Sequence, residues 1–219
     1  MSALLKKELR LSLHPSAGIF LGLAALMMIP NYPLTVTFFY PCLGVLFICQ
    51  TGRENRDVLF TTLLPLSRRD VVRGRLALTA LLQAGQIVLC VPFLFLRTLY
   101  PPEIRANAVG LDANLALLGV GLAQMGLFDL IFFSKYYRDT AKVGVPFLWG
   151  VAGVTVWISC WEALPHFVLL IRDRLDTPLF QCVPEKLGAL GVGVLLFAGC
   201  LLLAERIGGK RFEQLDLHE

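Results

Sequence analysis

Residue types that could carry out chemistry are few in this sequence, and they lie far apart. No Cys-x-x-Cys pair and no Cys/His cluster is present, so the spacing predicts neither a metal site nor a disulfide framework. Most of the cysteines fall inside apolar runs, where a thiol packs as a small apolar side chain. A bridge between Cys160 and Cys182 stays open, because both are predicted on one face of the protein. The residues concerned are three histidines (His14, His166 and His218) and six cysteines (Cys42, Cys49, Cys90, Cys160, Cys182 and Cys200).

Catalytic motifs are also absent from the sequence. It lacks HExxH, GxSxG and GxxxxGK[ST], which are typical of metalloproteases, serine hydrolases and P-loop nucleotide-binding proteins. The nearest likeness to a phosphate loop is Gly208-Gly209-Lys210-Arg211, which lacks the leading glycine and the Ser or Thr that would hold magnesium. We therefore expect no catalytic residue, no cofactor in this chain, and a flexible basic tail over residues 205–219.

Asp129 is the only acid that falls inside a predicted membrane span, and an intramembrane charge is a functional candidate by default. It lies near the end of its span, so it could pair with a base such as Lys135, or it could take part in gating or coupling. Gln83, Gln86 and Gln124 are also predicted inside spans, where we expect them to hydrogen-bond between helices.

The composition places these residues in a bilayer. Of 219 residues, 56% are hydrophobic and 16% are charged, against roughly 25% charged in a typical soluble domain. The mean hydropathy is +0.68. A soluble domain of this length could not bury so much apolar surface, which argues against a soluble enzyme and against disorder. The net charge of +4 is too small to suggest nucleic-acid binding.

Six stretches approach the length of about 20 apolar residues that a spanning helix needs. The sequence therefore predicts an all-α polytopic membrane protein, with a single transmembrane domain over residues 1–219. Pro30 and Pro33 break the chain between the first two stretches, which predicts a tight hairpin. Glycines recur within the stretches and should let the helices approach closely. The predicted spans are 13–29 and 34–51 (together 13–51), 76–96 and 114–134 (together 76–134), and 143–161 and 187–204 (together 143–204).

The distribution of basic residues predicts the orientation. Cytoplasmic segments of membrane proteins carry an excess of Lys and Arg. With the N-terminus inside, fifteen basic residues fall on the cytoplasmic side and five on the outer side, so both termini are predicted to be cytoplasmic. The inner residues are Lys6, Lys7, Arg10, Arg53, Arg56, Arg68, Arg69, Arg73, Arg75, Lys135, Arg138, Lys142, Arg206, Lys210 and Arg211, and the outer ones are Arg97, Arg105, Arg172, Arg174 and Lys186.

Two cytoplasmic segments have an amphipathic pattern. Residues 1–12 interleave charged residues with leucines, which predicts a surface helix rather than a cleaved signal peptide. In the segment 52–75, Ser67 and Asp70 have the spacing of a capping box, so a helix should begin there and continue into the third span. The apolar residues before it, among them Phe60, need a cover. They lie either on the bilayer surface or in a groove on a partner protein.

The order of these elements resembles the permease subunit of a type-2 ABC transporter, in particular the small bacterial permeases of phenol-soluble-modulin exporters. The resemblance lies in the LLKKEL segment near the N-terminus, the tight outer turn, and the stretch GRENRDVLFTTLLPLSRRDVVRGR that enters the third span. It implies a subunit of the bacterial plasma membrane that works as a dimer, with an identical or a related second copy. Each copy would dock a separate ATPase subunit, which holds the ATP and magnesium.

The resemblance also implies roles for the 52–75 segment, which carries the coupling helix in that family. Glu54, Asn55, Asp57, Phe60, Thr61 and Thr62 would contact the ATPase, and Arg68, Arg69 and Asp70 would anchor the return of the loop. The cargo would be hydrophobic or amphipathic, such as a peptide, because the spans offer few charges. The alternatives are a stand-alone channel or immunity protein without an ATPase, and an intramembrane enzyme, for which Asp129 lacks a second acid.

Overall fold

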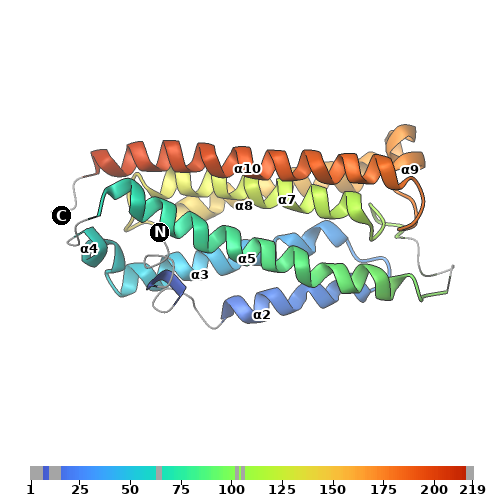
Figure 1. Cartoon of the computed structure of the whole chain (residues 1–219), viewed down its shortest axis with the longest axis horizontal. Helices are drawn as coiled ribbons and strands as arrows, with labels where there is room; N and C mark the ends of the chain where they lie inside the picture. The colour runs from blue at the N-terminus through green and yellow to red at the C-terminus, as the bar shows by residue number, and fades with distance from the viewer. Residues whose placement is uncertain (1–6, 10–15, 63–65, 102–103, 105–106, 216–219) are drawn as a thin grey trace.

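The computed structural model describes residues 7–9, 16–62, 66–101, 104 and 107–215, and this part of the chain is helical without any strand. The long helices run side by side as an elongated bundle (Figure 1). The short helix α4 lies at one end and α9 at the other, and these ends are called here the α4 end and the α9 end. The helices are α2 (Ser16–Gly22), η1 (Leu23–Met28), η2 (Leu34–Phe38), α3 (Tyr40–Glu54), α4 (Asp57–Thr62), α5 (Arg68–Arg97), α7 (Leu115–Tyr136), α8 (Gly144–Phe167), α9 (Leu169–Arg174) and α10 (Val183–Gln214).

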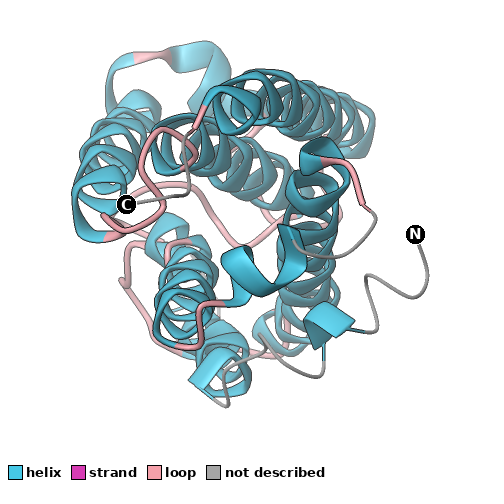
Figure 2. Cartoon of the chain, turned by 90° about the vertical axis from the view of Figure 1, so that its left-hand side faces the viewer, coloured by secondary structure: helices cyan, strands magenta, loops and turns pink. Residues whose placement is uncertain are grey.

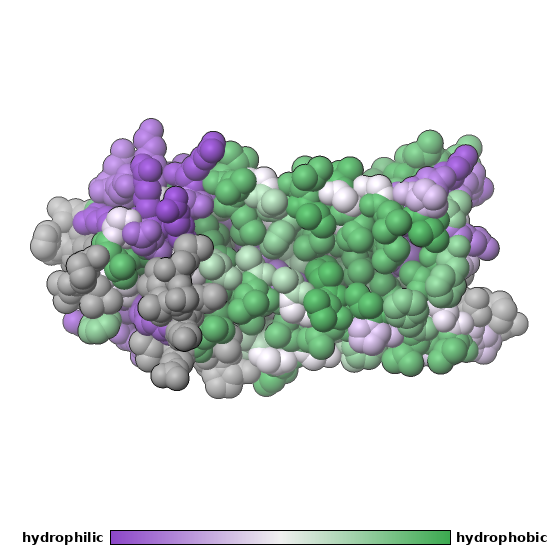
Figure 3. Space-filling model, in the orientation of Figure 1, coloured by the Kyte–Doolittle hydropathy of each residue, from purple (hydrophilic) through white to green (hydrophobic). Residues whose placement is uncertain are grey.

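Five helices of the described chain are long and apolar enough to cross a membrane: Leu34–Glu54, Arg68–Arg97, Leu115–Tyr136, Gly144–Phe167 and Val183–Gln214. They cover five of the six predicted stretches. The remaining stretch, 13–29, forms only a shorter apolar helix over Ser16–Met28, whose second half is 3₁₀, and residues 13–15 lie outside the described chain. On the face shown in Figure 3, an apolar belt formed by the long helices separates the more polar ends of the bundle.

Helix α5 begins as the capping pattern predicted. The Ser67 hydroxyl accepts a hydrogen bond from the Asp70 backbone N–H at 3.1 Å, and the Asp70 carboxylate accepts one from the Ser67 N–H at 3.3 Å. These bonds satisfy two donors at the helix start. The helix then runs unbroken for 30 residues, about 45 Å, which exceeds the hydrocarbon core of about 30 Å.

The predicted flexible tail is wrong over residues 205–214, because α10 continues to Gln214. The Gly208-Gly209 pair lies inside this helix and allows close contacts. A Cβ on Gly208 would lie 2.9 Å from the Tyr137 ring, and one on Gly209 would lie 3.2 Å from the Arg69 side chain. The glycines therefore pack the helix against its neighbours instead of making it flexible. Residues 216–219 lie outside the described chain.

Glycines also set the distance between α7 and α10, so the predicted close approach of helices at glycines holds here. It does not hold at Gly18, Gly22, Gly188 and Gly191, where nothing lies within 4 Å of an added Cβ. A Cβ on Gly119 would lie 2.5 Å from the Ala189 carbonyl oxygen, and one on Gly193 would overlap the backbone of Gly119. Farther along, a Cβ on Gly126 would lie 2.9 Å from the Cα of Phe197. The two helix backbones therefore touch, which only glycine permits at these positions.

A matched pair of substitutions on α10 tests this contact. Gly193→Ala should lower the free energy of unfolding by about 1–3 kcal/mol, because the new methyl group forces the two backbones apart. Gly191→Ala should have little effect, since no heavy atom lies within 4 Å of its Cβ. Melting of the purified protein in detergent measures both. Equal melting temperatures for the two variants would show that the close contact contributes nothing.

Candidate functional site

The segment with the predicted ATPase contacts forms the end of α3, a sharp turn, and α4. Arg56 makes the turn with a φ of 52°, and α4 follows over Asp57–Thr62. Seen from this end of the bundle, the α4 segment crosses in front of the longer helices (Figure 2). Glu54, Asn55 and Phe60 are exposed, and the Phe60 side chain keeps 57% of its surface accessible. These three residues are therefore free to meet a partner.

Two other predicted contact residues point into the protein. Asp57 and Thr61 are buried, one helical turn apart on α4. The Thr61 hydroxyl donates a hydrogen bond to the Asp57 carbonyl oxygen at 2.6 Å and accepts one from the Lys7 ammonium at 2.5 Å. Neither side chain is available to an outside partner in this conformation. The side chain of Thr62 lies outside the described part of the chain.

A buried charge cluster fastens α4 to α5, and it consists of Lys7, Glu8, Asp57 and Arg75. The Arg75 guanidinium lies 2.5 Å from the Asp57 carboxylate and 3.1 Å from that of Glu8. Lys7 in turn lies 2.5 Å from Asp57 and 3.2 Å from Glu8. Two positive and two negative groups thus balance one another. The cluster ties three segments, residues 7–9, α4 and α5, to one point.

The surroundings of Arg75 explain why it can be buried. Its guanidinium also donates to the Ile48 carbonyl oxygen at 3.3 Å. Gly52 makes room on α3, where a Cβ would lie only 3.2 Å from the guanidinium. Burial acts to raise the pKa of Asp57, but the hydrogen bond from Lys7 and the charge of Arg75 outweigh it and lower this pKa. The stabilisation that Asp57 provides is thus complete above its ordinary pKa of about 3.9 and is lost only in acid.

The residues predicted to anchor the loop's return bind the end of α10. Arg68 donates to the carbonyl oxygens of Phe212 at 2.8 Å and Leu215 at 2.6 Å, and it stacks over the Phe212 ring. The last carbonyl groups of a helix have no partner within the helix, so an arginine satisfies them well. Arg69 pairs with Glu213 at 2.8 Å. The start of α5 is thereby fixed to α10, and Asp70 serves as its cap.

The cluster itself was not predicted from the sequence. The sequence predicts Glu8 within a surface helix over residues 1–12, of which the structure describes only residues 7–9. It predicts Arg75 as one of the bases at the inner boundary. One feature of the sequence could have indicated the cluster: acids, Glu8 and Asp57, occur near the bases of the same segments. Such acids can neutralise charges that would otherwise face the apolar core. Sequence spacing could not show which acid would meet which base.

Asp129 does not form the expected ion pair with Lys135. Its carboxylate is fully buried and accepts a hydrogen bond from the Gln83 amide of α5 at 3.0 Å. Lys135 instead lies over the Trp149 ring, 4.5 Å from its centre. Gln86 donates to the Thr37 carbonyl oxygen at 3.5 Å, so the prediction of hydrogen bonds between helices is confirmed for Gln83 and Gln86. The side chain of Gln124 is buried without a hydrogen-bond partner among the described residues.

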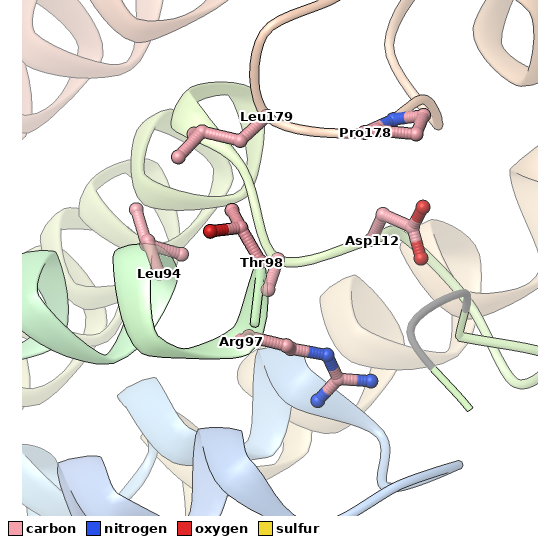
Figure 4. A pocket seen from close by; sticks show the side chains of 7 residues that line it. Leu94, Arg97, Thr98, Asp112, Pro178 and Leu179 are labelled. Carbon is pink, nitrogen blue, oxygen red and sulfur yellow. The ribbon is translucent and has the colours of Figure 1, made fainter. Parts of the chain in front are cut away.

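The α9 end of the bundle holds a second group of charged residues around a small cavity (Figure 4). Arg97 and Asp112 help to line this cavity, whose volume of about 10 Å³ admits little more than one water molecule. The Asp112 backbone N–H donates to Asp176 at 2.7 Å, which joins two loops. Burial raises the pKa of Asp176 to about 6. Cys160 and Cys182 are both free thiols, so no bridge links them.

No protein-family model, curated protein or solved structure matches this chain. The described residues contain no group of three or more His, Cys, Asp or Glu side chains that could hold a metal ion. At the α4 end, an exposed phenylalanine on a short helix is joined through buried ion pairs to a long helix.

Removing the guanidinium should loosen α4. Arg75→Met leaves two buried carboxylates facing Lys7 alone, so we expect the free energy of unfolding to fall by about 3–5 kcal/mol. Arg56→Met is the matched control, because Arg56 is exposed in the neighbouring turn. Thermal melting and limited proteolysis around α4 measure the difference. Identical melting and cleavage of the two variants would contradict a structural role for the cluster.

The α9 end should respond to mild acid. Above pH 6 the folded protein must ionise the half-buried Asp176, and lowering the pH through about 6 removes this cost. Between pH 7 and pH 5 the free energy of unfolding of the wild type should therefore rise by about 1 kcal/mol relative to that of Asp176→Asn, after allowance for the partial exposure of this side chain. Asp173→Asn, at an exposed position, should show the same rise relative to Asp176→Asn. A melting series in which both variants follow the wild type would disprove the assignment.

Proposed function

We propose that this chain is the membrane-spanning permease subunit of an ATP-driven exporter in the bacterial plasma membrane, with ATP hydrolysis on a separate ATPase subunit. One observation carries the proposal. The apolar Phe60 is exposed on α4, while Asp57 of the same short helix is held to α5 by a buried ion pair. A helix that only lay on the bilayer would not need such a rigid attachment.

The geometry suggests how a push on α4 would reach the membrane. Asp57 lies on α4 and Arg75 on α5, so a displacement of α4 acts directly on the long helix. Arg68 and Arg69 extend the same displacement to α10. ATP binding by the partner is useful only if it favours one arrangement of these helices over another. Two copies of the chain, identical or related, would enclose the path.

The distribution of charges supports a topology with both termini in the cytoplasm. Separate parts of the chain that carry basic residues meet at the α4 end: Arg73 pairs with Glu205 at 2.6 Å, and Arg53 donates to the Ala141 carbonyl oxygen at 3.3 Å. Ser16–Met28 would serve as the sixth span beside the five long helices. The cargo would be hydrophobic or amphipathic, because exposed side chains along the helices are mainly apolar.

Phe60 provides the test. A buried aromatic side chain at an interface can account for about 2 kcal/mol, or about thirtyfold in affinity. The wild-type chain, purified in detergent from its own cells, should retain an ATP-binding chain that mass spectrometry identifies. Phe60→Ala should reduce that recovery about thirtyfold at limiting concentration. Phe167→Ala is the matched control, because Phe167 is also an exposed phenylalanine but lies at the α9 end.

Two results would overturn the proposal. If the wild type retains no ATP-binding chain, a stand-alone channel or immunity protein takes its place. If the ATPase is retained equally by Phe60→Ala and Phe167→Ala, α4 is not the docking element, and its apolar residue faces lipid instead.

A further inference from the structure

One face of α5 carries polar side chains deep into the bundle. Arg75, Thr79, Gln83 and Gln86 follow one another at intervals of four, four and three residues, and all four are buried. Intervals of three and four place them along a single side of the helix. This face begins at the charge cluster and reaches the one acid of the neighbouring α7 that is fully buried, Asp129.

Asp129 has no cation among the described residues to balance a negative charge. Gln83 donates to its Oδ1, and Oδ2 has no hydrogen-bond partner among the described residues. No nitrogen of a Lys, Arg or His side chain in the described chain lies within 4 Å of the Asp129 carboxyl oxygens, the distance that an ion pair requires. A buried carboxylate without a cation is far more costly than a buried neutral acid. The neutral form needs one proton, and Oδ2 is the atom left to carry it.

The described helices packed around Asp129 place no cation beside it that could neutralise its charge in place of a proton. The titratable groups that interact with it electrostatically are thiols, Cys42 and Cys49 of α3 and Cys200 of α10. Arg75 acts on Cys49 from the α4 end, but Glu8 and Asp57 already neutralise it. Contacts of α8 and η2 with α7 include Phe147, Gly150, Gly153 and Phe38, which do not titrate. Lys135 of α7 lies over the Trp149 ring of α8 and forms no ion pair with Asp129.

We propose that Asp129 and Gln83 form a proton-binding site in the core of the bundle, and that the bound proton holds α5 against α7. The hydrogen bond between these two residues joins the two helices directly. Loss of the proton would place an unbalanced charge at this contact and favour separation of the helices. The proton is therefore a ligand with different affinities for the packed and the separated arrangement. This site does not depend on an ATPase partner.

Infrared spectroscopy tests whether the proton is present. The purified wild-type protein at pH 7 should show the carbonyl band of a protonated carboxylic acid. Asp129→Asn should remove this band, and Asp173→Asn, at an exposed acid, should retain it. Gln83→Leu should shift the band without removing it, because the hydrogen bond to Oδ1 is lost; this second variant identifies the band even if Asp129→Asn does not fold. A spectrum at pH 7 without any band that depends on Asp129 would overturn the proposal.

Stability against pH provides an independent measurement. Because the folded wild type must keep a proton that the unfolded chain releases, its folding equilibrium constant should fall about tenfold per pH unit relative to Asp129→Asn above pH 5. Parallel curves for the two proteins would contradict the site. A last measurement compares the stability of the wild type in potassium and in sodium buffers of equal ionic strength. Stabilisation of the wild type by sodium, together with no carboxylic band, would assign the site to a metal cation instead.

Discussion

Burial of the Arg75 guanidinium is the constraint on which the α4 end depends. A charge removed from water must meet opposite charges and hydrogen-bond acceptors close by, because its desolvation is otherwise too costly. Arg75 meets this requirement through Asp57, Glu8 and the Ile48 carbonyl oxygen. Each of these partners belongs to a different segment of the chain. The positions of α4, of residues 7–9 and of the end of α3 are therefore set together rather than one at a time.

Small residues make room beside large charged side chains at this end of the bundle. Gly52 leaves space for the guanidinium, and Gly209 leaves space for the Arg69 side chain. Between α7 and α10 the glycines act without charges, since Gly119 and Gly193 let two backbones touch. Close helix contacts of this kind rely on van der Waals packing, which does not weaken in an apolar solvent. These contacts hold α7 and α10 together beside the charged residues of the α4 end.

Helix α5 links the two features that carry the functional proposals. Its first turns bind α4 and α10, and its buried polar face leads to Asp129. A displacement of α4 and a change in the protonation of Asp129 would therefore act on the same helix. An unbroken helix of 30 residues is well suited to this role, because its backbone hydrogen bonds resist bending between the two sites.

The all-helical class, the approximate position of five long apolar helices and the capping box at Ser67 could be predicted from the sequence alone. These features follow from local chemistry: apolar runs, spacing along one helix, and side chains that bond to their own backbone. The contacts of Glu8 and Asp57 with Arg75, the hydrogen bond from Gln83 to Asp129 and the continuation of α10 through its glycines became apparent only from the packed structure. Partner choice between segments depends on how the helices are rotated and how deeply they are buried. The rotation and the depth of each helix are set by the packing of the whole bundle. This packing decides which acid lies close enough to pair with a given buried base.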